Sequence, residues 1–270
     1  MKQYAAAIAA TKGARNRQED AAALWPGPAT SCTPCDRPAS EGWLIAVLAD
    51  GMGGHAGGTL ASRTACERFI EAYADASDDA RERDANASVR AWLESGLDAA
   101  NRAIAAEIDR DRLLNGMGTT LIGAAFGPRG LEWISVGDSP LYLWREGELA
   151  LVNEDHSLAP LLDEMARNGK ITEAEARGDQ RRHMLRSAVT GEDFELVDVC
   201  AKPLLLEAGD IVVLASDGIH TLESSEISRV IAAYAKDGPQ AVADALIRDV
   251  DGLRDPHQDN FTLVVVEVVA

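Results

Sequence analysis

Acidic residues recur at the ends of apolar, strand-like segments in this sequence. Asp50 and Asp217 each follow a continuous apolar run. Asp138 lies between two further apolar segments, and Asp259 comes just before the last one. Side chains at strand ends can converge on one edge of a sheet, so we expect these carboxylates to lie close together. Asp is also a common turn former, so a single Asp-Gly pair would be weak evidence of a site.

Glu19 and Asp20, at the start of another candidate strand, extend this group of acids. Converging carboxylates repel one another, and some of them would stay protonated. A divalent cation removes that repulsion and inverts the local electrostatics. Few His or Cys residues accompany these acids, and a set of hard oxygen ligands favours Mg²⁺ or Mn²⁺ over zinc.

The segments that would carry these acids in the first half of the chain read as a strand and two helices. Residues 43–49 predict a buried strand because the run is continuously apolar. Thr59 is a candidate N-cap for a helix whose apolar residues recur every four positions, from Ala61 to Tyr73. Residues 75–86 are charged without periodicity and predict a solvated loop. Residues 89–108 predict a second, amphipathic helix.

The second half of the chain reads mainly as short strands followed by helices. Residues 119–126, 131–136, 140–144 and 149–152 are apolar and separated by turn residues, which predicts an antiparallel meander. Polar residues 158–182 predict an inserted helical flap. A strand is expected at 211–215, helices at 227–235 and 240–253, and a last strand at 261–269. This order is typical of an α+β fold, and we expect residues 1–270 to form a single domain.

Seven short motifs follow one another along the chain. The first is residues 15–20 (Arg-Asn-Arg-Gln-Glu-Asp) and the second is residues 50–58 (Asp-Gly-Met-Gly-Gly-His-Ala-Gly-Gly). The others are residues 116–120 (Gly-Met-Gly-Thr-Thr), 136–139 (Val-Gly-Asp-Ser), 155–157 (Asp-His-Ser), 215–218 (Ala-Ser-Asp-Gly) and 259–262 (Asp-Asn-Phe-Thr). Together they resemble, in order, the motifs of bacterial members of the metal-dependent protein phosphatase 2C (PP2C, or PPM) family of Ser/Thr protein phosphatases. The resemblance runs from about residue 12 to the C-terminus.

The resemblance implies a PP2C-like αββα sandwich, in which two antiparallel β-sheets are flanked by helices. It also implies a dinuclear Mn²⁺ or Mg²⁺ centre at one end, with Asp50 bridging the two ions. Glu19 and the carbonyl of Gly51 would bind one ion, and Asp217 and Asp259 would bind the other.

Further roles are implied by the same resemblance. Bacterial members often hold a third metal, and Asp138 and Asp217 occupy the matching positions. Asp20 would accept a hydrogen bond from a metal-bound water. Arg15 would hold the substrate phosphate, for which a planar, permanently charged bidentate donor is suited. The implied reaction is hydrolysis of phosphoserine or phosphothreonine by a water activated between two cations. The implied partners are phosphorylated proteins and a cognate Ser/Thr kinase.

Two positions depart from the family pattern. Eukaryotic relatives carry a His directly after the Asp-Gly, where this sequence has Met52, which cannot donate a proton. His55 lies nearby, and we expect a structural role for it within the glycine-rich turn. Pro140 replaces an Arg that usually follows the Gly-Asp-Ser motif. Residues 181–183 (Arg-Arg-His) form a local basic spot that either contacts a phosphopeptide or is a solvated charge run.

Three other functions share single features with this sequence. A PP2C-like module that binds phosphoproteins without hydrolysing them is the main alternative, and loss of Asp50, Asp217 or Asp259 would favour it; all three are present. A Rossmann interpretation of residues 51–56 would place Asp50 beside a pyrophosphate, which is unfavourable, and would not suit the meander. A P-loop is excluded because the glycine-rich stretch lacks Gly-Lys-Ser/Thr.

The composition limits the partners further. With 26 basic and 44 acidic residues the net charge is −18, which argues against binding nucleic acid or anionic membrane through a general positive field. Hydrophobic residues make up 46% of the chain, which indicates a folded protein. No run approaches the length of a membrane helix, and the N-terminus does not resemble a signal peptide. Four cysteines favour a cytoplasmic protein with reduced thiols. Cys32 and Cys35 form a Cys-x-x-Cys, which is typical of half a zinc site or a redox pair, but without a second pair or a following helix we expect two loop thiols.

Overall fold

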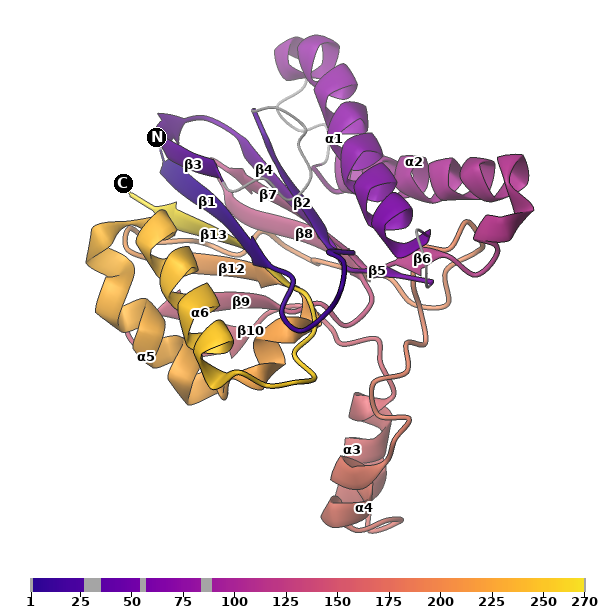
Figure 1. Ribbon diagram of the computed structural model, residues 1–270. Helices are drawn as coiled ribbons and strands as arrows, with labels where there is room; N and C mark the ends of the chain where they lie inside the picture. The colour runs from indigo at the N-terminus through magenta and orange to yellow at the C-terminus, as the bar shows by residue number, and fades with distance from the viewer. Residues whose placement is uncertain (1, 27–34, 54–56, 84–88, 270) are drawn as a thin grey trace.

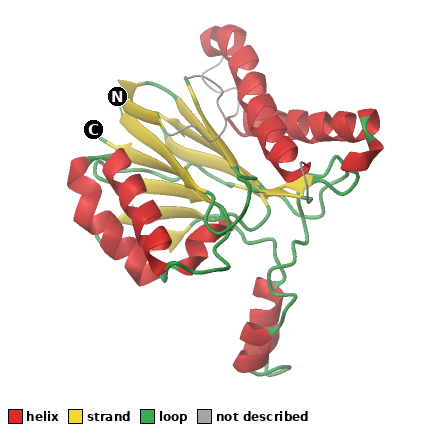
Figure 2. Cartoon of the chain, in the orientation of Figure 1, coloured by secondary structure: helices red, strands yellow, loops and turns green. Residues whose placement is uncertain are grey.

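Two antiparallel sheets pack face to face in the structure, and helices cover the outer face of each (Figures 1 and 2). The structure is a computed structural model that describes residues 2–26, 35–53, 57–83 and 89–269. The first sheet has the order β10 (Glu148–Leu151), β9 (Leu141–Arg145), β12 (Ile211–Ala215), β13 (Phe261–Val268), β1 (Gln3–Thr11), β3 (Cys35–Glu41). The second has the order β11 (Asp198–Val199), β8 (Gly130–Val136), β7 (Leu121–Gly127), β4 (Leu44–Ala49), β2 (Ala21–Trp25). The predicted αββα sandwich is confirmed.

The remaining elements lie outside these two sheets. The strands β5 (Gly51–Met52) and β6 (Gly118–Thr119) form a short two-stranded ribbon. The helices α1 (Gly57–Arg83) and α2 (Val89–Arg110) cover the second sheet, and α5 (Ser224–Tyr234) and α6 (Pro239–Leu253) cover the first. The flap consists of α3 (Ala159–Arg167) and α4 (Glu173–Gly178), which project away from the sandwich (Figure 1).

The strand β4 is continuously apolar because both of its faces are buried. Leu44, Ala46 and Leu48 point into the core between the two sheets. Ile45, Val47 and Ala49 alternate with them and point into the core beneath α1 and α2. Side chains of a strand face opposite sides of the sheet in turn, so a strand covered on both faces is apolar at every position.

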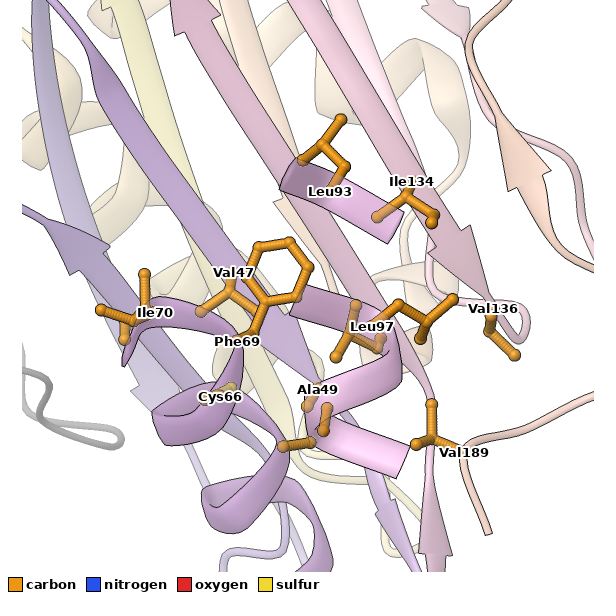
Figure 3. Packing of buried hydrophobic residues seen from close by; sticks show 14 of the residues in the cluster. Val47, Ala49, Cys66, Phe69, Ile70, Leu93, Leu97, Ile134, Val136 and Val189 are labelled. Atoms are coloured by element: carbon orange, nitrogen blue, oxygen red, sulfur yellow. The ribbon is translucent and has the colours of Figure 1, made fainter. Parts of the chain in front are cut away.

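The core beneath α1 and α2 is centred on Phe69 of α1 (Figure 3). Its ring lies over Gly123 of β7 and beside Gly96 of α2, where a Cβ atom would collide with it. Leu93 and Leu97 of α2 complete the contact with β8. The two glycines therefore let a long helix pack closely on the sheet whose strands lead to the acidic residues.

Two expectations for the first helix were wrong. The loop expected at residues 75–86 is wrong as far as Arg83, because α1 continues to that residue, and residues 84–86 lie outside the described residues. The stretch is rich in Ala, Arg and Glu, which have high helix propensity, and this outweighs its lack of an apolar face. Thr59 lies inside the helix rather than at its N-cap, and its hydroxyl donates to the carbonyl of Gln18 at 3.0 Å.

The expected meander is only partly correct. The pairs β7–β8 and β9–β10 are antiparallel neighbours, but β8 and β9 belong to different sheets. Residues 137–140, which we call the Asp138 turn, carry the chain from one sheet to the other. The strand β1 was not predicted, because its Ala-rich sequence has low β propensity. It is nevertheless an interior strand, lying between β13 and the edge strand β3.

The cysteines and His55 lie in different parts of the chain. Cys32 and His55 lie outside the described residues, and Cys35 begins β3. Cys66 and Cys200 are buried. Among the helices that the structure describes, none has both the length and the apolar character needed to cross a membrane.

Candidate active site

The acidic residues predicted to converge do so around one cleft at the end of the sandwich. The cleft has a volume of about 1170 Å³. Among the residues that line it are Glu19, Asp50, Asp138, Asp217 and Asp259. They come from the ends of β2, β4, β8, β12 and β13. Gly51 and Arg15 line the same cleft, so the predicted metal ligands and the predicted phosphate-binding residue lie together.

Glu19 is held through its backbone by Asn260, which directly precedes β13, and by Ser62 of α1. Its N–H donates to Oδ1 of Asn260 at 2.7 Å, and its carbonyl accepts from Ser62 Oγ at 2.6 Å. The amide of Asn260 also donates to the carbonyls of Lys12 and Arg17. Asn260 therefore ties the loop before β2 to the strand that follows Asp259.

Asp50 is fixed by the two threonines at the start of the β7 hairpin. Its N–H donates to Thr120 Oγ1 at 3.0 Å, and its carbonyl accepts from Thr119 Oγ1 at 2.7 Å. The next residue, Gly51, packs against Gly58 and Glu19 with no room for a Cβ atom. A Cβ on Gly58 would lie 2.9 Å from both Glu19 Oε2 and the carbonyl oxygen of Gly51. The two oxygens expected to share one metal thus face the same small space.

Asp20 lies beneath the cleft and is 2% exposed. Ser216 Oγ donates to its carboxylate at 2.8 Å, and the Thr262 N–H donates to Ser216 Oγ at 2.9 Å. Asp217 begins the turn that follows Ser216, so Asp20 is connected to the base of the Asp217 turn.

Burial dominates the electrostatics of these acids. It raises the pKa of Asp20 to about 7 and that of Asp138 to about 7. Burial, followed by repulsion from the surrounding aspartates, raises the pKa of Asp50 well above its usual range. The pKa of Asp217 is raised by burial and then by the charge of Asp259. Without protons or cations, this cluster is therefore electrostatically unfavourable.

The donor set fits Mn²⁺ or Mg²⁺ in its chemistry, because it consists of carboxylate and carbonyl oxygens that repel one another. Within the described ranges, no three His, Cys, Asp or Glu side chains already surround one point as metal ligands do. Asp50 lies beside Asp20 and Asp217, and Asp259 accepts from Arg15 at 2.6 Å. These contacts would have to be exchanged for contacts with the ions.

The rim of the cleft includes residues that sequence reasoning missed. Residues 184–188 and several residues in 190–195 line it on the flap side, but none of them was predicted to do so. Thr120 and Asn260 lay within recognised motifs but had been given no role. Local sequence carries little signal for them, because their partners lie 70 and 241 residues away.

The predicted basic spot at the flap is mostly neutralised within the flap itself. Arg181 pairs with Asp179 at 2.8 Å, and Arg182 pairs with Asp163 at 2.8 Å. His183 lines the cleft, as does Met52, the residue found where a proton-donating His was considered. Pro140 lies in the Asp138 turn, and its carbonyl accepts from the Ala215 N–H at 3.1 Å.

The raised pKa values predict a characteristic loss of stability with pH for the metal-free protein. Asp20 and Asp138 are protonated up to about pH 7 when folded, but only up to about pH 4 when unfolded. The folded state then binds more protons between these values, so the free energy of unfolding falls as pH rises through them. Lowered pKa values of His156 and His220 oppose this trend below about pH 6.5, but the raised acids outnumber them.

Thermal unfolding in the presence of a chelator checks this prediction. We expect a lower Tm at pH 8 than at pH 5, and a larger rise in Tm on adding Mn²⁺ at pH 8. Asp138→Asn should flatten the profile, because it removes one of the protons bound on folding. A Tm that rises steadily from pH 5 to pH 8 in the metal-free protein would show that the acids are not buried together.

Comparisons with known proteins agree with the geometry. A sequence model of the family described as protein phosphatase 2C matches residues 35–241. The serine/threonine protein phosphatase PstP of Mycobacterium tuberculosis is 35% identical over 230 residues, which cover 84% of this chain and 41% of that protein. This chain thus spans less than half the length of that relative.

Two further comparisons cover more of the related chain. The serine/threonine phosphatase stp of Listeria monocytogenes is 30% identical over 224 residues, which cover 83% of this chain and 84% of that protein. Among solved structures, the catalytic domain of PstP in complex with two manganese ions matches with a TM-score of 0.73 at 29% identity. That match covers 100% of both chains.

Proposed function

The chain belongs to the protein phosphatase 2C family, and on this premise we propose that it is a metal-dependent protein phosphatase acting on phosphoserine and phosphothreonine. The observation that carries the proposal is the convergence of Glu19, Asp50, Asp138, Asp217 and Asp259 on one cleft beside Arg15. A binding module without catalysis would not need to keep this costly cluster of buried acids.

The proposed chemistry follows from the substrate. A phosphate monoester is very stable in water, so its hydrolysis needs a strong nucleophile and neutralisation of charge. Divalent ions in such a site supply both, by lowering the pKa of water and by offsetting negative charge. The PstP catalytic domain holds two manganese ions, which supports proposing two here.

Five residues of the cleft have a proposed task in holding the ions. Asp50 would lie between the two ions, with Glu19 and the Gly51 carbonyl on one side. Asp217 and Asp259 would hold the other. The backbones of Glu19 and Asp50 are fixed by hydrogen bonds to neighbouring elements, and the Asp259 side chain accepts from the Asn260 N–H, so these donors start close to their working positions.

The remaining roles at the site are to hold a third ion, to orient Asp50 and to bind the phosphate. Asp138 and Asp217 would hold a third ion. Asp20, which accepts from Ser216 and lies beside Asp50, would orient Asp50 and accept a hydrogen bond from water in the centre. The side chain of Arg15 is 58% exposed and pairs with Asp259, so it can turn to the phosphoryl oxygens when Asp259 binds metal.

A chelator-controlled assay tests the proposed activity. We expect hydrolysis of p-nitrophenyl phosphate and of phosphothreonine peptides to be stimulated by Mn²⁺ and abolished by a chelator. Thiol alkylation should leave the rate unchanged, because Cys66 and Cys200 are buried and neither lines the cleft. A protein that binds phosphopeptide in excess Mn²⁺ without hydrolysing it would instead be the regulatory binding module.

Further parts of the proposal depend on the family resemblance. We propose that residues 1–270 act as one catalytic domain in the cytoplasm, on proteins phosphorylated by a cognate Ser/Thr kinase. The net charge of −18 supports an enzyme that does not act on nucleic acid or insert into membranes.

A further inference from the structure

The Asp138 turn is held from one side by Asn153, which was given no role from the sequence. Oδ1 of Asn153 accepts from the Leu141 N–H at 2.7 Å, and its Nδ2 donates to the Ser139 carbonyl at 3.0 Å. Nδ2 also donates to Ser135 Oγ at 3.2 Å. The side chain is buried, so these bonds are shielded from competing water. Asn153 thus fixes the residues that directly follow Asp138.

His156 holds the same turn from the other side. Its N–H donates to the Gly137 carbonyl at 3.1 Å, and its Nδ1 accepts from the Gly137 N–H at 3.3 Å. Gly137 has a φ of +107°, a conformation that favours glycine, and its Cα lies against Thr120. The backbone just before Asp138 therefore has little freedom to move.

The two ring nitrogens of His156 differ in their hydrogen bonding. Because Nδ1 accepts a hydrogen bond, the neutral ring carries its proton on Nε2. Nε2 is buried and has no hydrogen-bond partner among the described residues. A buried donor without a partner costs free energy. The contact from Nδ1 to Gly137 is therefore the polar contact that the buried ring supplies.

His156 also connects this turn to the flap. Its carbonyl accepts from the Arg186 N–H at 2.8 Å. The next residues continue the contact, since Ser157 forms an antiparallel bridge with Leu185 and the Leu158 N–H donates to the Met184 carbonyl at 3.0 Å. These paired segments are the base of the flap, from which α3 and α4 project (Figure 1). Residues 184–186 line the cleft as well.

We propose that Asn153 and His156 are positioning residues that fix the Asp138 turn and couple it to the base of the flap. The proposal rests on Asp138 being a metal ligand, as proposed above. A metal bound by Asp138 would then restrain His156 and through it the flap. Metal bound by Asp138 would then raise the affinity for a substrate that orders the flap. That substrate would raise the affinity for the metal by the same factor, because coupling between two binding events is reciprocal.

Metal titration of variants tests the positioning role. His156→Leu removes the acceptor for the Gly137 N–H, and we expect about 10- to 100-fold weaker binding of the Mn²⁺ held by Asp138, measured by calorimetry. His156→Asn places an amide oxygen close to the position of Nδ1 and should retain most of the affinity. In an Asp138→Asn background, His156→Leu should have no further effect on Mn²⁺ binding. The exposed His257, changed to Leu, is the matched control.

Limited proteolysis tests the coupling to the flap. Lys170 and Arg177 are exposed flap residues at which trypsin can cut. Mn²⁺ should slow cleavage there about fivefold or more in the wild type and in His156→Asn, but not in His156→Leu or Asp138→Asn. Asn153→Asp, which keeps Oδ1 but loses the two donated bonds, should show an intermediate effect.

The proposal is overturned if His156→Leu binds Mn²⁺ as the wild type does, or if Mn²⁺ leaves flap cleavage unchanged in the wild type. It is also overturned if Asn and Leu at position 156 are equally damaging, since the ring would then only fill space. Neither readout uses catalytic turnover. A protein that shows the expected metal and flap responses but hydrolyses no phosphopeptide would refute the proposed function and leave this coupling standing.

Discussion

Asp217→Asn is expected to lower phosphopeptide turnover by more than about 100-fold, because loss of a direct metal ligand should exceed the 10- to 100-fold cost of losing an outer partner. Asp217 is proposed to serve two ions at once, so its loss weakens the centre more than loss of a ligand to one ion. Asn keeps the size of the side chain, and the change removes a buried acid whose pKa is raised by burial and by Asp259. The fold should therefore persist in the metal-free variant.

Steady-state hydrolysis of a phosphothreonine peptide in saturating Mn²⁺ measures this effect, with circular dichroism as the check on folding. Asp244→Asn is the matched control, because Asp244 lies exposed on α6, away from the cleft. We expect the control to keep the wild-type rate. If folded Asp217→Asn turns over at the wild-type rate, the metal ligands have been assigned to the wrong residues.

Arg15→Ala should lower kcat/KM for phosphopeptides by about 100-fold, which is typical of losing one donor that stabilises charge in the transition state. Arg15→Lys should recover only part of this loss, because an ammonium cannot make the paired contacts of a guanidinium. The ion pair between Arg15 and Asp259 is largely exposed, so its loss should change the stability of the fold little.

The same variant makes a second prediction about metal. Arg15 holds Asp259 at 2.6 Å, so Arg15 and a metal ion compete for this carboxylate. Arg15→Ala should therefore bind Mn²⁺ at least as tightly as the wild type while hydrolysing substrate slowly. Calorimetry beside the kinetic assay separates the two effects. Weaker Mn²⁺ binding in Arg15→Ala would mean that Arg15 supports the metal centre rather than competing with it.

The parts of the fold that could be predicted are those whose burial produces a recognisable pattern in the local sequence. The strands β4 and β12 are apolar throughout because both of their faces are buried. The helix α2 repeats its apolar residues with helical spacing because one face packs on the sheet. Carboxylates next to such strands were therefore placed correctly in one cleft.

The parts that could not be predicted depend on distant partners. Local residues do not show that β9 pairs with β12 rather than β8. The pairing joins Leu141 to Leu214, which is far away in the sequence. The Asp138 turn looks like a hairpin turn for this reason, yet it crosses between sheets. Its supports, Asn153 and His156, carry no signal of that role in their own sequence, because their partners are 12 to 19 residues away.

The most direct test of the proposed metal-dependent activity is to add Mn²⁺ stepwise to the metal-free protein while recording phosphate released from a phosphothreonine peptide. Metal binding should be followed in the same sample. The carboxylate cluster predicts that phosphate release rises in step with Mn²⁺ binding, returns to zero when a chelator is added, and is absent from Asp217→Asn. Phosphate released at the same rate with chelator as with Mn²⁺ would contradict a metal-dependent phosphatase at this cleft.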